Sequence, residues 1–102
     1  MTHYVQTVRS RALPGRQAEY RDWYLSIHLP AVLSLDGFVS AELHRLVAAD
    51  DAPAEFLCVY QIETDDLQAT QAVMFAAGAT MVPSDAMDVE ATRVDVYESA
   101  SA

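Results

Sequence analysis

The chain has 102 residues, which fits a single domain over residues 1–102 with a modest core. Fifteen acidic residues against six basic ones give a net charge of −9, and a field of that sign repels phosphate backbones and anionic lipid. This balance argues against a nucleic-acid or membrane partner and favours a neutral or weakly acidic small-molecule ligand. With no apolar run near the ~18 residues of a membrane span and no signal-peptide pattern, a cytoplasmic protein is the default expectation.

The apolar pattern predicts the element order strand, helix, strand, strand, helix, strand. The expected strands cover residues 3–9, 38–47, 55–62 and 91–98, and a hairpin loop over 48–54 joins the middle two. The first expected helix opens at Pro14 and runs to about Leu33. The second is capped by Thr64 and ends near Gly78, and residues 80–88 follow it without a regular pattern.

This order predicts an α+β, ferredoxin-like βαββαβ fold, a four-stranded antiparallel sheet with both helices on one face. The third strand is apolar on both of its faces, so we expect it in the interior of the sheet. The helices leave the other sheet face bare. A second copy of the chain covering this face is the simplest solution, and a homodimer is therefore expected.

Aromatic and imidazole side chains share one face of the first expected helix. Tyr20, Tyr24 and His28 recur at i, i+4 and i+8. Apolar neighbours widen this row into a stripe, namely Trp23, Ile27 and Ala31. The pattern places an imidazole on the buried face, where apolar surroundings should lower its pKa and keep it neutral. Pro30 predicts a kink or break directly after it, because proline has no backbone N–H.

One spacing in this segment is distinctive: Trp23-Tyr24, then His28-Leu29-Pro30, then Gly37-Phe38. It resembles the EthD-like proteins, a family within the dimeric α+β-barrel superfamily, and the resemblance extends more weakly to Tyr60, over about residues 3–63. It implies a small homodimer with a ligand pocket in each subunit. It does not imply one reaction, because the superfamily hosts lyases, isomerases and cofactor-free oxygenases. Relatives often carry a polar residue where this chain has Ala31.

Element geometry allows a pocket to be placed around the imidazole. A helix rises ~1.5 Å and a strand ~3.3 Å per residue, so His28 should lie level with three strand segments. These offer Ser40, either Val5 or Gln6, and residues 95–97, while the sequence leaves open which strand parity faces the helices. The predicted site assigns acid–base catalysis to His28 with a hydroxyl of Tyr24 or Tyr60, and ligand contact to Tyr20, Trp23, Ser40 and Tyr97.

Each of these residues also has a purely structural interpretation. A buried histidine can be a core residue bonded to a tyrosine or a carbonyl, and a buried tyrosine often only packs. Cys58 lies in an apolar strand and is expected to be a buried, unreactive thiol. No metal site is expected, because His28 and His44 should differ in height by ~13 Å. No nucleotide-binding fingerprint occurs in the sequence, so no cofactor is expected.

Three functions are compatible with this site. The first is a cofactor-independent enzyme of the lyase, isomerase or cyclase type, acting on a small apolar, cyclic or aromatic (polyketide-like) molecule through acid–base chemistry at His28. The second is a cofactor-free monooxygenase of the same fold. The third is a binding or accessory protein, in which His28 only donates a hydrogen bond to the ligand.

Overall fold

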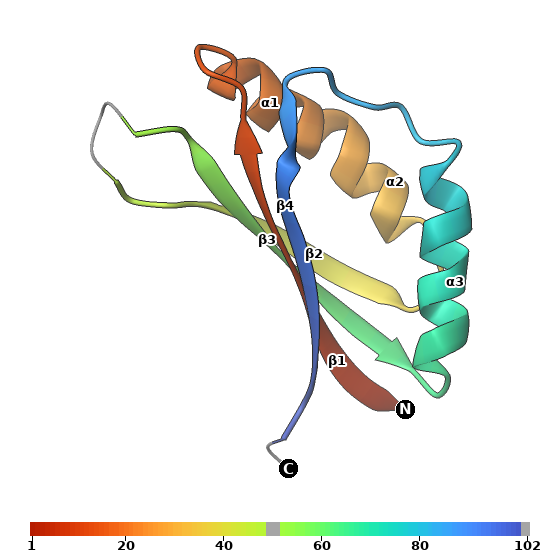
Figure 1. Ribbon diagram of the computed structural model, residues 1–102. Coiled ribbons are helices and arrows are strands. Elements are labelled where there is room, and N and C mark those ends of the chain that lie inside the picture. Colours follow the sequence, from red (N-terminus) through yellow and green to blue (C-terminus); the bar gives the residue numbers. More distant parts are fainter. Residues whose placement is uncertain (49–51, 101–102) are drawn as a thin grey trace.

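The computed structural model describes residues 1–48 and 52–100 and folds them into one sheet with helices on one side (Figure 1). The strands are β1 (Thr2–Ala12), β2 (Phe38–Arg45), β3 (Glu55–Thr64) and β4 (Met87–Glu98). The helices are α1 (Gln17–Trp23), the π-helical η1 (Tyr24–His28), α2 (Leu29–Leu33) and α3 (Leu67–Gly78). Within the two described ranges, no helix is long and apolar enough to cross a bilayer.

The sheet has the strand order β2-β3-β1-β4, and each neighbouring pair is antiparallel. Together with the element order, this is the ferredoxin-like α+β fold, so the predicted fold class is confirmed. β3 is an interior strand, as its two apolar faces predicted. Its helix-side residues are all buried, namely Phe56, Cys58, Tyr60 and Ile62, while the residues between them face the side without helices.

Two predicted helix starts are wrong by a few residues. α1 begins at Gln17 rather than at Pro14, because the chain first turns at Gly15, whose φ of 78° is not helical. The N-cap of α3 is Asp66, not Thr64, because the Asp66 carboxylate accepts the N–H of the third residue beyond it. The Thr64 hydroxyl instead accepts the N–H of Asp66 and shapes the turn before the helix.

The last strand starts earlier than predicted. β4 begins at Met87 rather than at residue 91, because Met87 and Asp88 pair with the end of β1. The segment before it is tied to α1, where Arg16 binds the Asp85 carboxylate at 2.7 Å and the Trp23 indole donates to the carbonyl of Val82 at 3.0 Å. Of the predicted hairpin loop over 48–54, residues 49–51 lie outside the described residues.

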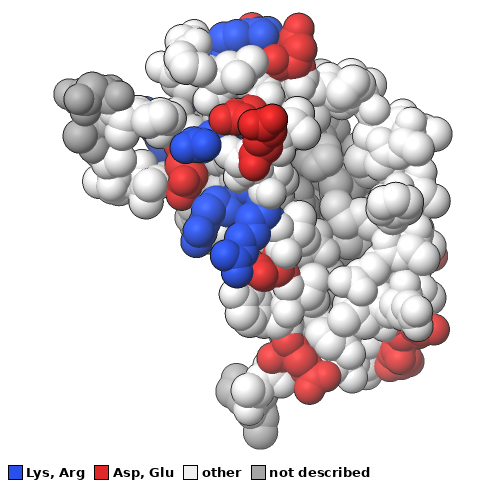
Figure 2. All heavy atoms as spheres, in the orientation of Figure 1, with Lys and Arg blue, Asp and Glu red and all other residues white. Residues whose placement is uncertain are grey.

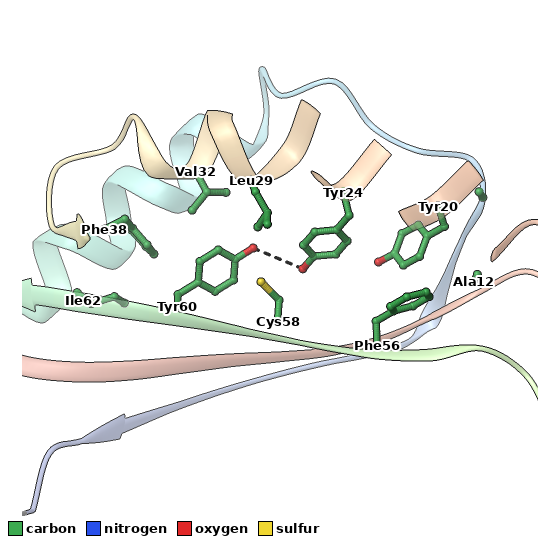
Figure 3. Packing of buried hydrophobic residues seen from close by; sticks show 11 residues of the cluster. Ala12, Tyr20, Tyr24, Leu29, Val32, Phe38, Phe56, Cys58, Tyr60 and Ile62 are labelled. Atoms are coloured by element: carbon green, nitrogen blue, oxygen red, sulfur yellow. Dashed lines mark hydrogen bonds between the residues drawn. The ribbon is translucent and has the colours of Figure 1, made fainter. Parts of the chain in front are cut away.

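The core lies between the α1–η1–α2 segment and the middle of the sheet (Figure 3). Tyr20 and Tyr24 point from the helices toward Phe56, Cys58 and Tyr60 on β3. The rings of Tyr20 and Phe56 meet edge to face with centroids 5.6 Å apart, a favoured aromatic geometry. Cys58 is completely buried, as predicted, and burial raises the pKa of its thiol.

A π-helical turn changes which side of the helix is buried. The N–H of Leu29 bonds to the carbonyl of Tyr24, five residues back, so one extra residue is wound into this turn. The buried row therefore continues from Tyr24 to Leu29 and Val32, and not to His28 as the regular spacing predicted. His28 is displaced to the flank of the row and is half-buried.

Pro30 accounts for the wide turn. In an α-helix its ring would press on the carbonyl of Ser26, four residues earlier, and it has no N–H to donate to that carbonyl. The helix widens before the proline and then continues through it, since Pro30 is the second residue of α2. The predicted break after His28 is therefore a π turn ahead of Pro30. The same rotation leaves Ile27 exposed, although the sequence pattern placed it in the buried stripe.

Candidate functional site

A cleft of about 600 Å³ opens between the sheet and α3. The sheet contributes residues from β1, β3 and β4, η1 contributes one residue, and α3 contributes one helical face. The lining residues are Gln6, Val8, His28, Tyr60, Gln71, Met74, Phe75, Gly78, Ala79 and Val94. Figure 2 shows the molecule hollowed between β4 and α3, with the acidic and basic side chains outside the hollow. The cleft is thus an uncharged, mostly apolar site with a few polar groups.

His28 is the only titratable group of the lining besides the phenol of Tyr60. Its ring stacks on Trp23 with centroids 4.8 Å apart, and it meets the Tyr24 ring nearly at right angles with centroids 5.1 Å apart. Burial lowers the pKa of His28, as predicted, so the imidazole is neutral near neutral pH. Burial is the one cause of this shift, and no carboxylate among the described residues offsets the cost of charging the ring.

The two ring nitrogens of His28 differ in their surroundings. Nδ1 is buried and has no hydrogen-bond partner in the described part of the chain. Nε2 also has no partner there, but it is not sealed off. A neutral imidazole carries its proton on one nitrogen only, so Nε2 can either accept or donate a proton toward a ligand in the cleft.

Tyr60 and Tyr24 form a buried pair behind the cleft. Their hydroxyls are 3.4 Å apart (Figure 3). Tyr60 is among the cleft-lining residues, whereas Tyr24 is not. Burial raises the pKa of both phenols, with a further contribution from the neighbouring Cys58. Both hydroxyls therefore stay protonated. The Tyr60 side chain is completely buried beneath the cleft surface, so a ligand meets its hydroxyl only when the covering side chains move aside, and Tyr60 can then donate while its own oxygen accepts from Tyr24.

Two predicted ligand contacts are structural neighbours of the site. Tyr20 is buried and donates its hydroxyl to Ser10 at 2.7 Å, about two helical turns before the cleft-lining His28. Trp23 stacks between Tyr20 and His28, and its indole N–H is engaged by Val82. Neither lines the cleft. Trp23 supports the His28 ring, so any effect it has on a ligand passes through the imidazole.

Ser40 and Tyr97 lie on the opposite face of the sheet, away from this cleft. A bulge after Phe38 places Ser40 opposite Gln61, so its side chain leaves the helix side. Tyr97 pairs with Val5 on the same bare face and is 58% exposed. Of the two alternatives left open on β1, the cleft is lined by Gln6 and not by Val5.

The α3 wall was not predicted. Gln71, Met74, Phe75 and Gly78 stand at i, i+3, i+4 and i+7 and form one face of the helix. Small apolar residues surround α3 on its other sides as well, so its sequence shows no distinct stripe. The spacing alone identifies this face only once the cleft is known. No group of three or more metal-ligating side chains converges in residues 1–48 and 52–100.

No family model and no curated protein matches the sequence. Solved structures match it over nearly its whole length. The heme-degrader MhuD from Mycobacterium tuberculosis, with two hemes bound in its active site, has a TM-score of 0.70 and 19% identity and covers 97% of both chains. A proposed monooxygenase from Shewanella loihica PV-4 has a TM-score of 0.63 and 16% identity, over 100% of this chain and 99% of that one.

The predicted fold resemblance is confirmed. An EthD family protein from Bacillus halodurans C-125 has a TM-score of 0.60 and 12% identity, over 97% of this chain and 99% of that one. These neighbours share the ferredoxin-like fold of the dimeric α+β-barrel superfamily. Because identities of 12–19% establish a common fold only, ligand and reaction must be argued from the residues of this cleft.

Proposed function

We propose that the chain is a cofactor-independent enzyme that binds a small, uncharged cyclic or aromatic molecule in the cleft and performs acid–base chemistry on it with His28. One observation supports this above the others: an imidazole with an open nitrogen lies in a cleft that is otherwise apolar. The lowered pKa of His28 keeps it in the form that accepts a proton. The absence of charged lining residues favours an uncharged ligand.

In this proposal Nε2 of His28 removes a proton from the carbon beside a ligand carbonyl. The Tyr60 hydroxyl donates a hydrogen bond to the enolate oxygen that forms. Since no carboxylate faces Nδ1 in the described residues, the imidazolium is poorly stabilised and returns its proton quickly. Return to a second carbon gives isomerisation, and delivery to a leaving hydroxyl gives dehydration, so a lyase or isomerase is favoured.

Tyr24 has a positioning role in this proposal. Its ring packs nearly at right angles to that of His28, and its hydroxyl contacts that of Tyr60, so it holds both groups without reaching the cleft. This revises the sequence-based assignment of Tyr24 to the chemistry itself.

Deuterium exchange into β-tetralone, an uncharged bicyclic ketone, tests the proposal. The protein should accelerate exchange at the carbon beside the carbonyl, and His28→Gln should reduce that acceleration by about 10²- to 10⁴-fold. His44→Gln is the matched control, because His44 lies on the exposed bare face of β2 and should leave exchange unchanged. Binding of β-tetralone without accelerated exchange would mean a binding protein. No binding at all would contradict the proposed ligand class.

A cofactor-free monooxygenase is the second candidate, and the similarity to a proposed monooxygenase favours it. The same proton removal would then give a carbanion that reacts with oxygen. Anthrone, which forms a stabilised carbanion, is the appropriate probe. Oxygen uptake that depends on His28 would support this candidate, and exchange without oxygen uptake would support the isomerase or lyase.

Heme fits this cleft less well than a neutral ring compound does. MhuD holds two hemes, but heme carries two carboxylates, and no cation lines the cleft of this chain. An optical titration with hemin should therefore give weaker binding than the neutral probes give.

We further propose that the bare sheet face is covered by a second copy. Half-buried apolar residues lie at its centre, namely Val5, Leu57 and Val59. A stable pair would bury about 1,600 Å² in total. Light scattering should give about twice the 11.2 kDa of one chain, and a monomer at micromolar concentration would contradict the proposal.

A further inference from the structure

Gln6 is a deeply buried amide of the cleft, with 4% of its surface exposed. Two other polar residues are comparably buried, and both have hydroxyl partners: Ser10 bonds Tyr20 at 2.7 Å, and Thr70 bonds Thr64 at 2.8 Å. Gln6 has no such partner in the described part of the chain. Buried amides are normally hydrogen-bonded, so this one needs an explanation.

The Gln6 amide makes one weak contact. Its Nε2 donates to Sδ of Met74 on α3 at 3.5 Å, and a thioether sulfur is a poor acceptor. The carbonyl Oε1 has no partner among the described residues, and it is not sealed from solvent. Because sulfur accepts and does not donate, this contact favours the orientation with the nitrogen toward Met74, which leaves the carbonyl free for another donor.

Gln6 also lies beside the proposed oxyanion donor. In the antiparallel register Gln6 on β1 is directly opposite Tyr60 on β3, and both side chains face the helices. Side chains at such paired positions start about 5 Å apart. The floor of the cleft thus presents a phenol that donates next to an amide oxygen that accepts.

We infer that Gln6 determines specificity, by accepting a hydrogen bond from a hydroxyl or N–H that the ligand carries near its carbonyl. The inference rests on the proposed function and narrows its substrate class from neutral ring ketones to hydroxylated ones. Tyr60 then donates to the carbonyl and Gln6 accepts from the neighbouring hydroxyl. A ligand without that hydroxyl leaves the Gln6 carbonyl unpaired, which is how a polar site rejects an analogue that cannot bond to it.

Two probes of nearly the same shape distinguish a hydrogen bond to Gln6 from simple apolar binding in the cleft. α-Naphthol has a hydroxyl that donates, and its methyl ether does not. Calorimetry on the wild-type chain should give about tenfold or tighter binding of α-naphthol, the discrimination that one hydrogen bond to a buried group supplies. Gln6→Met should abolish this preference while the methyl ether still binds. The matched control Gln61→Met, on the bare face of β3, should keep the preference.

The melting temperature of Gln6→Met gives a second readout. If the amide is unpaired until a ligand binds, Gln6→Met removes a buried polar group that lacks a strong hydrogen bond. The ligand-free variant should then melt at a higher temperature than the ligand-free wild-type chain. If the amide is a structural group, the variant melts lower or fails to fold, and the inference is overturned. A Gln6→Met protein that keeps the α-naphthol preference also overturns it and leaves the proposed function intact. If neither probe binds the wild-type chain while β-tetralone still exchanges in a His28-dependent way, the inference is overturned and the proposed function stands. If β-tetralone is neither bound nor exchanged, the proposed function itself fails.

Discussion

The two helical segments rest on the same sheet in different ways. The α1–η1–α2 segment buries large side chains, namely Tyr20, Tyr24, Leu29 and Val32. α3 buries only Thr70, and its Phe75 is 87% exposed although it faces the cleft. The first segment is therefore part of the core, and the second is a wall that stands away from the sheet (Figure 1).

Side-chain size explains this difference. Close packing requires that the space between a helix and a sheet be filled, and the tyrosines of α1 and η1 fill it. α3 turns mostly small side chains toward the interior, since after its first residue its more buried positions are Thr70, Met74 and Ala77 and only Met74 among these is large. The unfilled space is the cleft. α3 therefore forms a wall of the site because it contributes few side chains to the core.

Truncating one aromatic residue in each segment should give the largest contrast. Tyr24→Ala removes a ring that touches three other rings and should destabilise the fold by about 3–5 kcal/mol. Phe75→Ala removes an exposed ring and should change stability by less than about 0.5 kcal/mol while it weakens binding of α-naphthol. Urea unfolding measures both. A comparable loss in the two variants would mean that α3 is packed as core.

Substitutions at two glycines test the same difference between the α1–η1–α2 segment and α3. Gly37 has a φ of 92°, and a Cβ there would lie 3.1 Å from Cγ2 of Thr70 on α3. Gly37→Ala should therefore cost about 1–2 kcal/mol from backbone strain alone.

Gly78 ends α3, and a Cβ there meets nothing within 4 Å. Gly78→Ala should stabilise the helix by up to about 1 kcal/mol. In thermal unfolding, Gly37→Ala should lower the melting temperature and Gly78→Ala should raise it. A destabilising Gly78→Ala would show that this end of α3 closes against the sheet in solution.

The sequence predicted the fold and identified His28 as a candidate site residue. It did not predict which elements form the cleft. The recurrence of Tyr20, Tyr24 and His28 identified the important helix, and strand patterns gave the topology. The π turn before Pro30 could not be foreseen, because proline predicts a disturbance without saying whether the helix breaks or widens. That turn moves His28 out of the predicted buried row to the edge of the cleft.

Strand parity was the second limit. On β1 the side chains of Gln6 and Ser10 face the helices, while that of Val5 faces the bare side. The usual rule that apolar residues face the helices would therefore choose the wrong face of this strand. On β2 the bulge after Phe38 reverses the alternation, and Ser40 leaves the helix side. One local irregularity therefore changed a predicted ligand contact into a residue of the opposite face.

The hydroxyls of Tyr24 and Tyr60 allow a finer test of the packing between the α1–η1–α2 segment and the sheet. Tyr24→Phe and Tyr60→Phe should each cost about 0.5–1.5 kcal/mol, since each leaves a buried hydroxyl with fewer partners. The double variant should cost less than the sum, because both single changes remove the same contact. Additive losses would mean that the hydroxyls do not interact. Only Tyr60→Phe should also slow exchange strongly, because only Tyr60 lines the cleft.

The smallest expected effect is the pH dependence that His28 confers on stability. Burial lowers its pKa in the folded chain, whereas the unfolded chain keeps the ordinary value of about 6.5. Below that pH the unfolded chain binds a proton that the folded chain does not, so stability falls as pH drops from about 6.5 through the lowered folded pKa. Above about 6.5 both states are neutral, and His28 contributes no slope.

His28→Gln, which cannot titrate, isolates this contribution. The advantage of the wild-type melting temperature over that of His28→Gln should be constant above neutrality and should shrink as the pH falls. The exchange activity should follow the same group, remaining flat at neutral pH and declining only below the lowered pKa, where Nε2 already carries a proton. If the wild-type advantage grows in acid, the folded chain favours the imidazolium. His28 would then have an anionic neighbour, such as one supplied by a second subunit, and would act as an acid rather than a base.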